Sequence, residues 1–203
     1  AFDQACRALK AALDDYPRDD HRHGIIHGCL PTPEGIAVCR DYHIQMPMQS
    51  AFIGWKQEPD DYLERILGHD RLEKLNPIRT FRDNGIVVSF GSDAPCTTPD
   101  PIAWMDRAVN NGNAGQAVSV QDALRMCTYN GAWAAFDERE RGSLEAGKIA
   151  DMAVLSENPY TVPKDKLSCL RVERLYLSGK PYESCRESIL PMMLRGLTSR
   201  NKA

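Results

Sequence analysis

Short apolar runs alternate with amphipathic helical patterns along the first 90 residues, and this alternation restricts the fold more than any other feature. The apolar runs are HGIIHG at 23–28, HIQMPMQSAF at 43–52 and IVVSF at 86–90. Helical spacing of apolar residues occurs at 1–16, at 33–42, and at 59–84 in two pieces interrupted at Pro77. Continuous apolar strands joined by helices are typical of parallel sheets that helices cover. The sequence therefore predicts an α/β fold, with short buried strands in the three runs.

The pattern changes after the third run. A proline-rich loop, APCTTPDP at 94–101, leads to a helix over roughly 101–110 and to a second helix that opens at Ser119, with Asp122 as a weak capping box. From Gly142 onward, short strand-like runs with glycine turns predict a small β unit. We therefore divide the chain into an α/β part at 1–141, a β segment at 142–185 and a C-terminal tail at 186–203.

Composition excludes several classes of partner. The formal net charge of the 203 residues is −3, which favours neither nucleic acid nor an anionic membrane. No apolar run approaches the ~18 residues of a membrane span. Seven cysteines, an odd number without C-x-x-C spacing, argue against a disulfide framework and a zinc ribbon. They predict a cytoplasmic protein whose thiols are mostly small core residues.

Two residues stand where ligands bind in parallel α/β folds, at the carboxyl ends of strands. Asp93 comes three residues after Phe90, and His27 ends the first apolar run. A helix N-cap or an Asx turn would also explain Asp93. An imidazole and a carboxylate could together hold a divalent metal, but a catalytic zinc generally has three protein ligands plus water. From these residues alone, metal-dependent hydrolysis is one hypothesis among several.

The other histidines are weaker candidates. His21 and His23 lie at the amino end of the predicted strand. We therefore expect His21 at the surface, and we expect His23 either to pack against other side chains or to support a residue that binds the ligand. We expect His43 and His69 to be structural or solvated. Of the three tryptophans, which we expect to pack, only Trp55 lies in a long loop after a predicted strand, where it could offer an aromatic wall.

Four segments together resemble the C-terminal half of an amidohydrolase-superfamily enzyme, and the branch they resemble is that of the N-substituted formamide deformylases. They are RHGIIHG, GIVVSFGSDAPCTTPDP, SVQDALRMCTYNGAWAAF and GSLEAGKIADMAVLSENP, in the order that the family has them, and the resemblance runs from about 1 to 183. It implies a metal-dependent (β/α)8 TIM barrel, of which this chain would supply about strands 6 to 8, plus part of a small β-sandwich.

The resemblance also assigns the two candidate residues. His27 corresponds to the metal-ligand histidine at the end of the sixth strand, and Asp93 to the aspartate at the end of the eighth. The strand near Gln49 would be the seventh. One departure is Ile26, because the family often has an acid just before the histidine, and this puts in doubt the groups that support His27.

Other family ligands have no counterpart in the chain. These are an H-x-H on the first strand, a bridging lysine or acid on the fourth and a histidine on the fifth. The resemblance therefore implies a missing N-terminal half of the barrel, in the same gene or on another chain, through truncation, proteolysis or a split gene. Half a barrel leaves strand edges unpaired, so association, including a homo-oligomer, is expected.

The activity that the resemblance implies is hydrolysis of an amide-like C–N bond in a small-molecule substrate. One or two divalent ions, expected to be Zn²⁺, would activate water. Asp93 would bind the metal and act first as general base and then as general acid, while His27 holds the metal. The chain alone would be inactive. Two alternatives stay open: a non-catalytic binding or regulatory protein of amidohydrolase fold, and a self-sufficient small α/β protein.

Overall fold

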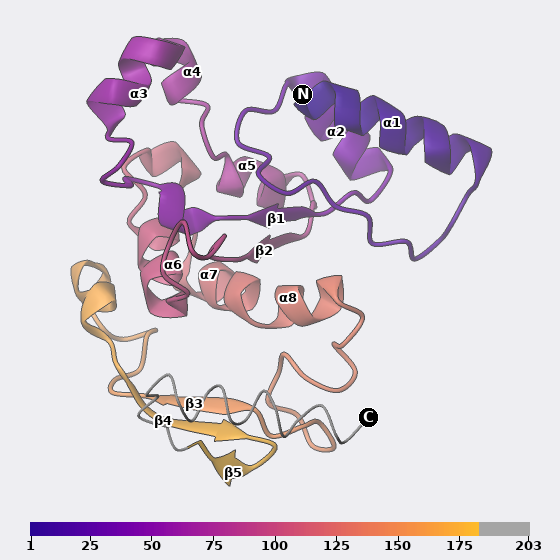
Figure 1. Cartoon of the computed structure of the whole chain (residues 1–203). Coiled ribbons are helices and arrows are strands. Elements are labelled where there is room, and N and C mark those ends of the chain that lie inside the picture. Colours follow the sequence, from indigo (N-terminus) through magenta and orange to yellow (C-terminus); the bar gives the residue numbers. More distant parts are fainter. Residues whose placement is uncertain (183–203) are drawn as a thin grey trace, which may run out of the picture.

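A small parallel sheet lies at the centre of the structure (Figure 1), a computed structural model that describes residues 1–182. Strand β1 (Met46–Met48) pairs in parallel with β2 (Val88–Phe90), with Met46 opposite Val88. Along the other edge of β1, residues 23–27 run parallel to it through a single bridge between Gly24 and Gln45. The order across the sheet is therefore 23–27, β1, β2, and β1 is the central strand.

Helices from both ends of the α/β part pack against this sheet in one buried cluster. In Figure 1, α1 (Phe2–Asp15), α2 (Pro33–Asp41) and α5 (Ile78–Asp83) lie above it, and α6 (Pro101–Val109), α7 (Val120–Cys127) and α8 (Tyr129–Ala134) lie below. The remaining helical elements are η1 (Ser50–Phe52), α3 (Asp60–Leu67), α4 (His69–Leu72), η2 (Ala114–Gln116) and η3 (Lys164–Cys169). The alternation of strands and helices that the sequence predicts is present.

The core forms where the strands meet the helices. Met46 and Met48 of β1 and Val88 of β2 are at most 1% exposed, and they belong to one buried cluster with Ile78 and Phe81 of α5. Because strand side chains alternate between faces, Gln45, Pro47 and Gln49 point to the face opposite this cluster. The two methionines of β1 therefore pack against the helices.

Capping side chains fix the starts of two predicted helices. Thr32 Oγ1 accepts a hydrogen bond from the Gly35 N–H at the start of α2. Ser119 and Asp122 form a complete capping box at the start of α7, in which each side chain accepts from the other residue's backbone N–H. The predicted N-cap at Ser119 is confirmed, because a capping box depends only on residues three apart in the sequence.

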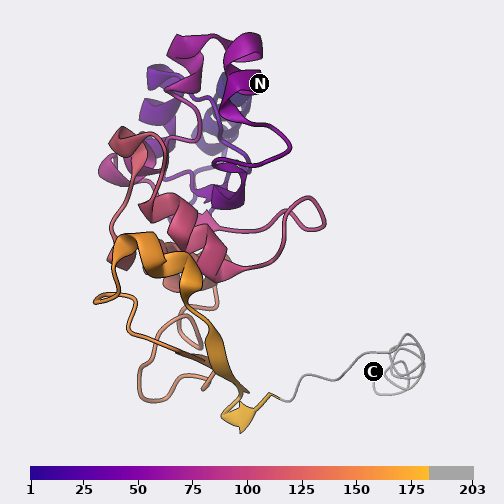
Figure 2. The ribbon, with the colours of Figure 1, turned by 90° about the vertical axis from the view of Figure 1, so that its left-hand side faces the viewer.

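A second sheet lies beyond α6–α8 and away from the first, as Figures 1 and 2 both show. Its strands β3 (Met152–Leu155), β4 (Val172–Leu177) and β5 (Lys180–Pro181) are antiparallel in the order β3-β4-β5. This is the small β unit that the sequence predicts after Gly142. The end of the predicted β segment, 183–185, and the predicted tail, 186–203, lie outside the described residues.

Two predicted elements are shorter than the sequence suggests. The helical stretch at 59–84 forms three helices rather than two, because α3 ends at Gly68, whose φ of +76° breaks the helix. The strand predicted at 43–52 covers only Met46–Met48 and then turns into the 3₁₀ helix η1. Each predicted element is therefore interrupted within the range that the sequence suggested.

The first apolar run is not the buried strand that we expected. It makes one isolated bridge, and Ile26 is 62% exposed. Within the part of the chain that the structure describes, only one edge of this run has a strand beside it, and little covers the side chain of Ile26. Among residues 1–182, no helix is long and apolar enough to cross a membrane.

Candidate functional site

His27 and Asp93 meet at the carboxyl rim of the parallel sheet. His27 Nε2 lies 3.4 Å from Asp93 Oδ2, and each side chain is about two-fifths exposed. Asp93 follows β2, and His27 ends the 23–27 segment on the other side of β1. The two residues therefore flank the central strand β1. Solvent reaches both groups, so the pair is open to a small ligand.

Both residues have a left-handed backbone. The φ angles are +58° at His27 and +54° at Asp93, a region that few residues other than glycine adopt. Such conformations persist only where the surrounding structure enforces them, and they concentrate at functional sites. The left-handed turn also ends the strand alternation at His27.

Backbone hydrogen bonds hold the two residues in place. The His27 N–H donates to the Pro47 carbonyl of β1 at 3.4 Å, and the Cys96 N–H donates to the Asp93 carbonyl at 2.9 Å. Ser92 Oγ accepts from the Ala94 N–H at 3.1 Å, which closes the turn around the carboxylate. This turn uses the Ser92 hydroxyl and the Asp93 backbone carbonyl rather than the Asp93 carboxylate, so it is not the Asx turn that we considered for Asp93.

An aromatic pair extends from His27. The Phe52 ring, at the end of η1, lies 5.9 Å from the His27 ring, and the Trp55 ring lies 4.9 Å from that of Phe52 in an edge-to-face arrangement. Phe52 also lines a cavity of about 900 Å³ between α3, α4 and α6. Trp55 therefore packs on Phe52, whose ring lies beside that of His27, while the aromatic wall that its loop position suggested stays a prediction.

The donors of the pair fit part of a metal site. An imidazole nitrogen and a carboxylate oxygen are both ordinary ligands of Zn²⁺, and here they face each other. Within residues 1–182, however, no group of three or more His, Cys, Asp or Glu side chains is placed to hold a metal ion. His27 and Asp93 can thus supply two ligands of a site that needs more.

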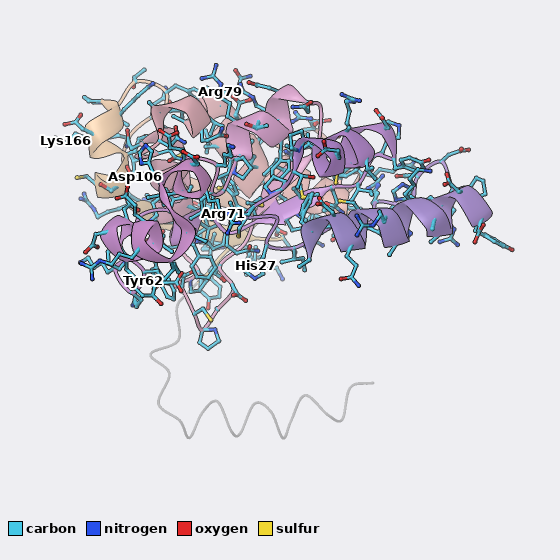
Figure 3. All side chains as sticks on the ribbon, turned by 90° about the horizontal axis from the view of Figure 1, so that it is seen from above. His27, Tyr62, Arg71, Arg79, Asp106 and Lys166 are labelled. Carbon is cyan, nitrogen blue, oxygen red and sulfur yellow. The ribbon has the colours of Figure 1, made fainter. Side chains whose placement is uncertain are left out.

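The remaining histidines lie elsewhere. His21 Nε2 is 2.9 Å from the Tyr42 carbonyl oxygen and its ring stacks on that of His23 at 4.7 Å. His21 is thus partly buried rather than a surface residue, while His23, expected in packing, is exposed. His43 is exposed, and His69 is exposed beside Glu64. Figure 3 shows His27 on the opposite side of the molecule from Arg79 of α5.

Sequence reasoning missed one residue of this rim, Gln49. It directly follows β1, as His27 and Asp93 follow their own segments, and it is 7% exposed. Its Oε1 atom has no hydrogen-bond partner among the residues that the structure describes. Its position after a strand was the available signal, but a glutamine is not a typical metal ligand or acid–base group, and so it did not stand out.

Comparison with known proteins identifies the family. A family model described as the amidohydrolase family matches residues 1–182. The chain belongs to the amidohydrolase family. The resemblance found in the four sequence segments is therefore confirmed over the whole described part of this amidohydrolase.

Relatives and solved structures agree with this assignment. An N-substituted formamide deformylase from Arthrobacter pascens is 37% identical over 132 residues, which are 62% of this chain and 22% of the relative. A metal-dependent hydrolase of Pyrococcus furiosus, itself uncharacterized, superposes with a TM-score of 0.63 at 24% identity, over 76% of this chain and 32% of that one. An adenosine deaminase of Xanthomonas campestris with bound zinc gives 0.61 at 18%, over 95% and 45%.

These matches bear on the fold and on the extent of the chain. The structural likeness shows that this mixed α/β chain has the fold of amidohydrolase barrels. The chain spans less than half the length of each of these proteins. Its neighbours are metal-dependent hydrolases by name, which agrees with the donor types of His27 and Asp93.

Proposed function

We propose that this amidohydrolase takes part in metal-dependent hydrolysis of an amide-like C–N bond in a small molecule. His27 and Asp93 would be two ligands of a divalent metal, Zn²⁺ in our proposal. The observation that carries the proposal is the 3.4 Å approach of His27 Nε2 to Asp93 Oδ2 at the strand rim. The names of a deformylase relative and of a zinc-bound structural neighbour support the reaction class and the metal.

The proposal extends to the architecture. Residues 23–27, β1 and β2 would be the sixth, seventh and eighth strands of a barrel, and β3–β5 part of a small β-sandwich. The parallel order of the three segments supports this assignment. The units would be 1–141 and 142–185, with a tail at 186–203. The further ligands would come from the rest of the barrel, in the same gene or on another chain. Among residues 1–182 no strand lies beyond the 23–27 segment, and this edge would be open to a second copy of this chain.

Each residue has a separate role in the proposed reaction. The metal supplies Lewis acidity, which polarises the scissile carbonyl and acidifies water. Asp93 accepts the proton of the attacking water and passes it to the leaving nitrogen, so that one carboxylate acts as base and then as acid. His27 holds its imidazole toward the same point, and the Phe52 ring limits the rotation of this imidazole from one side. The six described cysteines are all free, which supports the proposed cytoplasmic location.

Metal binding tests the assignment of the ligands. We expect the chain to bind Co²⁺, used as a spectroscopic probe for Zn²⁺, weakly, because it has only two facing donors. Either His27→Asn or Asp93→Asn should weaken binding at least tenfold. His43→Asn is the matched control: His43 is also exposed and left-handed, but it lies before β1, at the far end of the strand. Binding that both site variants retain would contradict the assignment, and tight stoichiometric zinc on wild type would contradict an incomplete site.

Activity separates hydrolysis from the non-catalytic alternative. Amine release from an N-alkylformamide would be measured for the chain alone and for the chain combined with a polypeptide that carries the remaining barrel strands. We expect release only from the combination, and Asp93→Asn should reduce it by about 10³-fold or more, because it removes both a ligand and the proton acceptor. Metal binding without amine release from the combination would favour the binding or regulatory alternative.

A further inference from the structure

Gln49 stands at the centre of the rim that His27 and Asp93 share. It follows Met48, the last residue of β1, and its φ of −115° and ψ of 83° keep the backbone close to extended. On one side, the His27 N–H donates to the Pro47 carbonyl; on the other, the Gly91 N–H donates to the Met48 carbonyl at 3.0 Å. These hydrogen bonds place Gln49 at the same end of the sheet as His27 and Asp93.

The carboxamide of Gln49 is buried with an unused acceptor. The residue is 7% exposed, and within residues 1–182 its Oε1 has no partner and its Nε2 reaches only the Pro47 carbonyl, at 3.5 Å. This contact to a carbonyl oxygen favours the assignment of that end of the amide as the nitrogen. A buried polar atom is normally hydrogen-bonded, so an unpaired one calls for an explanation.

Packing does not explain the carboxamide. The 3₁₀ turn after β1 uses the Gln49 backbone carbonyl, which accepts from the Phe52 N–H at 3.0 Å, and needs no side chain. The adjacent Ser50 is also buried, but its hydroxyl is satisfied by the Trp104 carbonyl at 2.9 Å. The Ser50 hydroxyl is therefore paired within the protein, whereas the enclosed Gln49 Oε1 atom has no partner among residues 1–182, so its acceptor is unused.

Gln45 offers an internal comparison. It lies on the same face of the same strand, is 5% exposed, and also has an unpaired Oε1. Its Nε2 donates to the Arg22 carbonyl at 2.6 Å, at the end of β1 away from His27 and Asp93. Gln45 thus ties two backbone segments together, whereas the amide of Gln49 has no comparable anchor.

We infer that Gln49 is a specificity-determining residue whose Oε1 accepts a hydrogen bond from the N–H of a secondary amide substrate, an inference that rests on the proposed function. Gln49 selects amides that carry one substituent and one hydrogen on nitrogen. A tertiary amide, which has no N–H, leaves the buried oxygen unpaired and binds more weakly. Sites built to receive a hydrogen bond reject analogues that lack the donor for this reason.

The test is a comparison of binding, which does not depend on turnover. The full chain, ¹⁵N-labelled and without metal, is titrated by NMR with a simple N-alkylformamide and with its N-methylated counterpart. We expect wild type to bind the N–H compound about five- to tenfold more tightly, the effect of about one hydrogen bond. The side-chain NH₂ signal of Gln49 should shift with the first compound.

Variants show whether this residue is the cause. Gln49→Leu should remove the preference, and Gln49→Met, a second apolar variant of similar length, should do the same if Gln49→Leu folds poorly. Gln45→Leu, the matched control, should lower stability but keep the preference. Equal binding of both compounds by wild type, no binding of either, or a preference that survives in both Gln49 variants would overturn the inference. Discrimination without hydrolysis by the combined chains would contradict only the proposed function.

Discussion

The side chain of Arg22 contacts several residues that are distant in the sequence. Its guanidinium lies between the rings of Trp133 and Phe136, at 4.6 and 4.1 Å from their centroids. It also donates to both carboxylate oxygens of Glu138 at 2.8 Å. Arg22 thereby links the segment before the 23–27 strand to the end of α8. Nothing in the local sequence predicts this link, because Trp133, Phe136 and Glu138 are more than 100 residues away from Arg22.

Glu138 should make stability depend on pH. The hydrogen bonds from Arg22 lower the pKa of Glu138 from its ordinary 4.5 to about 2 in the folded protein. The ionised form therefore stabilises the fold above about pH 4.5, and this contribution is lost as pH falls toward 2. We expect Glu138→Gln to lower the melting temperature at pH 6 and to have little effect near pH 2. Thermal melts of both proteins across this range measure the difference, and a difference that does not shrink in acid would contradict the expectation.

Site residues were predictable where a motif combined with a strand end. His27 and Asp93 follow apolar runs and match family motifs, and the structure brings them together. Gln49 and Phe52 were not predicted, because their roles depend on burial and on a ring contact across the rim. The left-handed backbone at His27 and Asp93 was also unpredictable, because a histidine or an aspartate in a sequence does not signal a positive φ as a glycine does.

The connection between α8 and the second sheet depends on a glycine. Gly142 has a φ of +89°, and a Cβ atom there would lie 2.5 Å from Ala132 Cβ and 3.1 Å from Tyr129 Cα. Gly147, five residues later, has a φ of +92°, but a Cβ atom there would have nothing within 4 Å. Comparing substitutions at Gly142 and Gly147 therefore separates the cost of a left-handed backbone, present at both positions, from the cost of a steric clash, present only at Gly142.

Alanine at these two positions should have different effects. Gly147→Ala should reduce the free energy of unfolding by about 1–2 kcal/mol, the cost of a left-handed non-glycine residue. Gly142→Ala should add about 1–3 kcal/mol for overpacking against α8. Urea unfolding of the two variants gives the comparison directly. Equal losses would mean that α8 moves aside at no measurable cost.

Elements were predicted best where the signal is local. Helix α1 and the start of α7 follow from helical spacing and from a capping box three residues long. The run at 23–28 failed as a buried strand, because burial of a strand depends on what pairs with its edges and covers its faces. The stretch at 59–84 was divided wrongly, because a helical pattern does not reveal that Gly68 adopts a positive φ.

For the molecule as a whole, the family and the barrel-type fold were predictable from sequence. The family model and the structural neighbours agree with both. The relation between the two sheets was not predictable, because it is made by contacts between distant segments such as η3 and α6. Leu167 of η3 is fully buried, although the local sequence gives no periodic signal for it.

The central position of β1 has a consequence for how this protein can change. The separation of His27 and Asp93 is measured across β1, so it is a property of the backbone ladder, while the methionines of that strand face the helices. Substitutions in the helices can therefore change the melting temperature of the protein with little effect on the distance between His27 and Asp93. Conversely, an insertion in β1 would displace both halves of the pair at once.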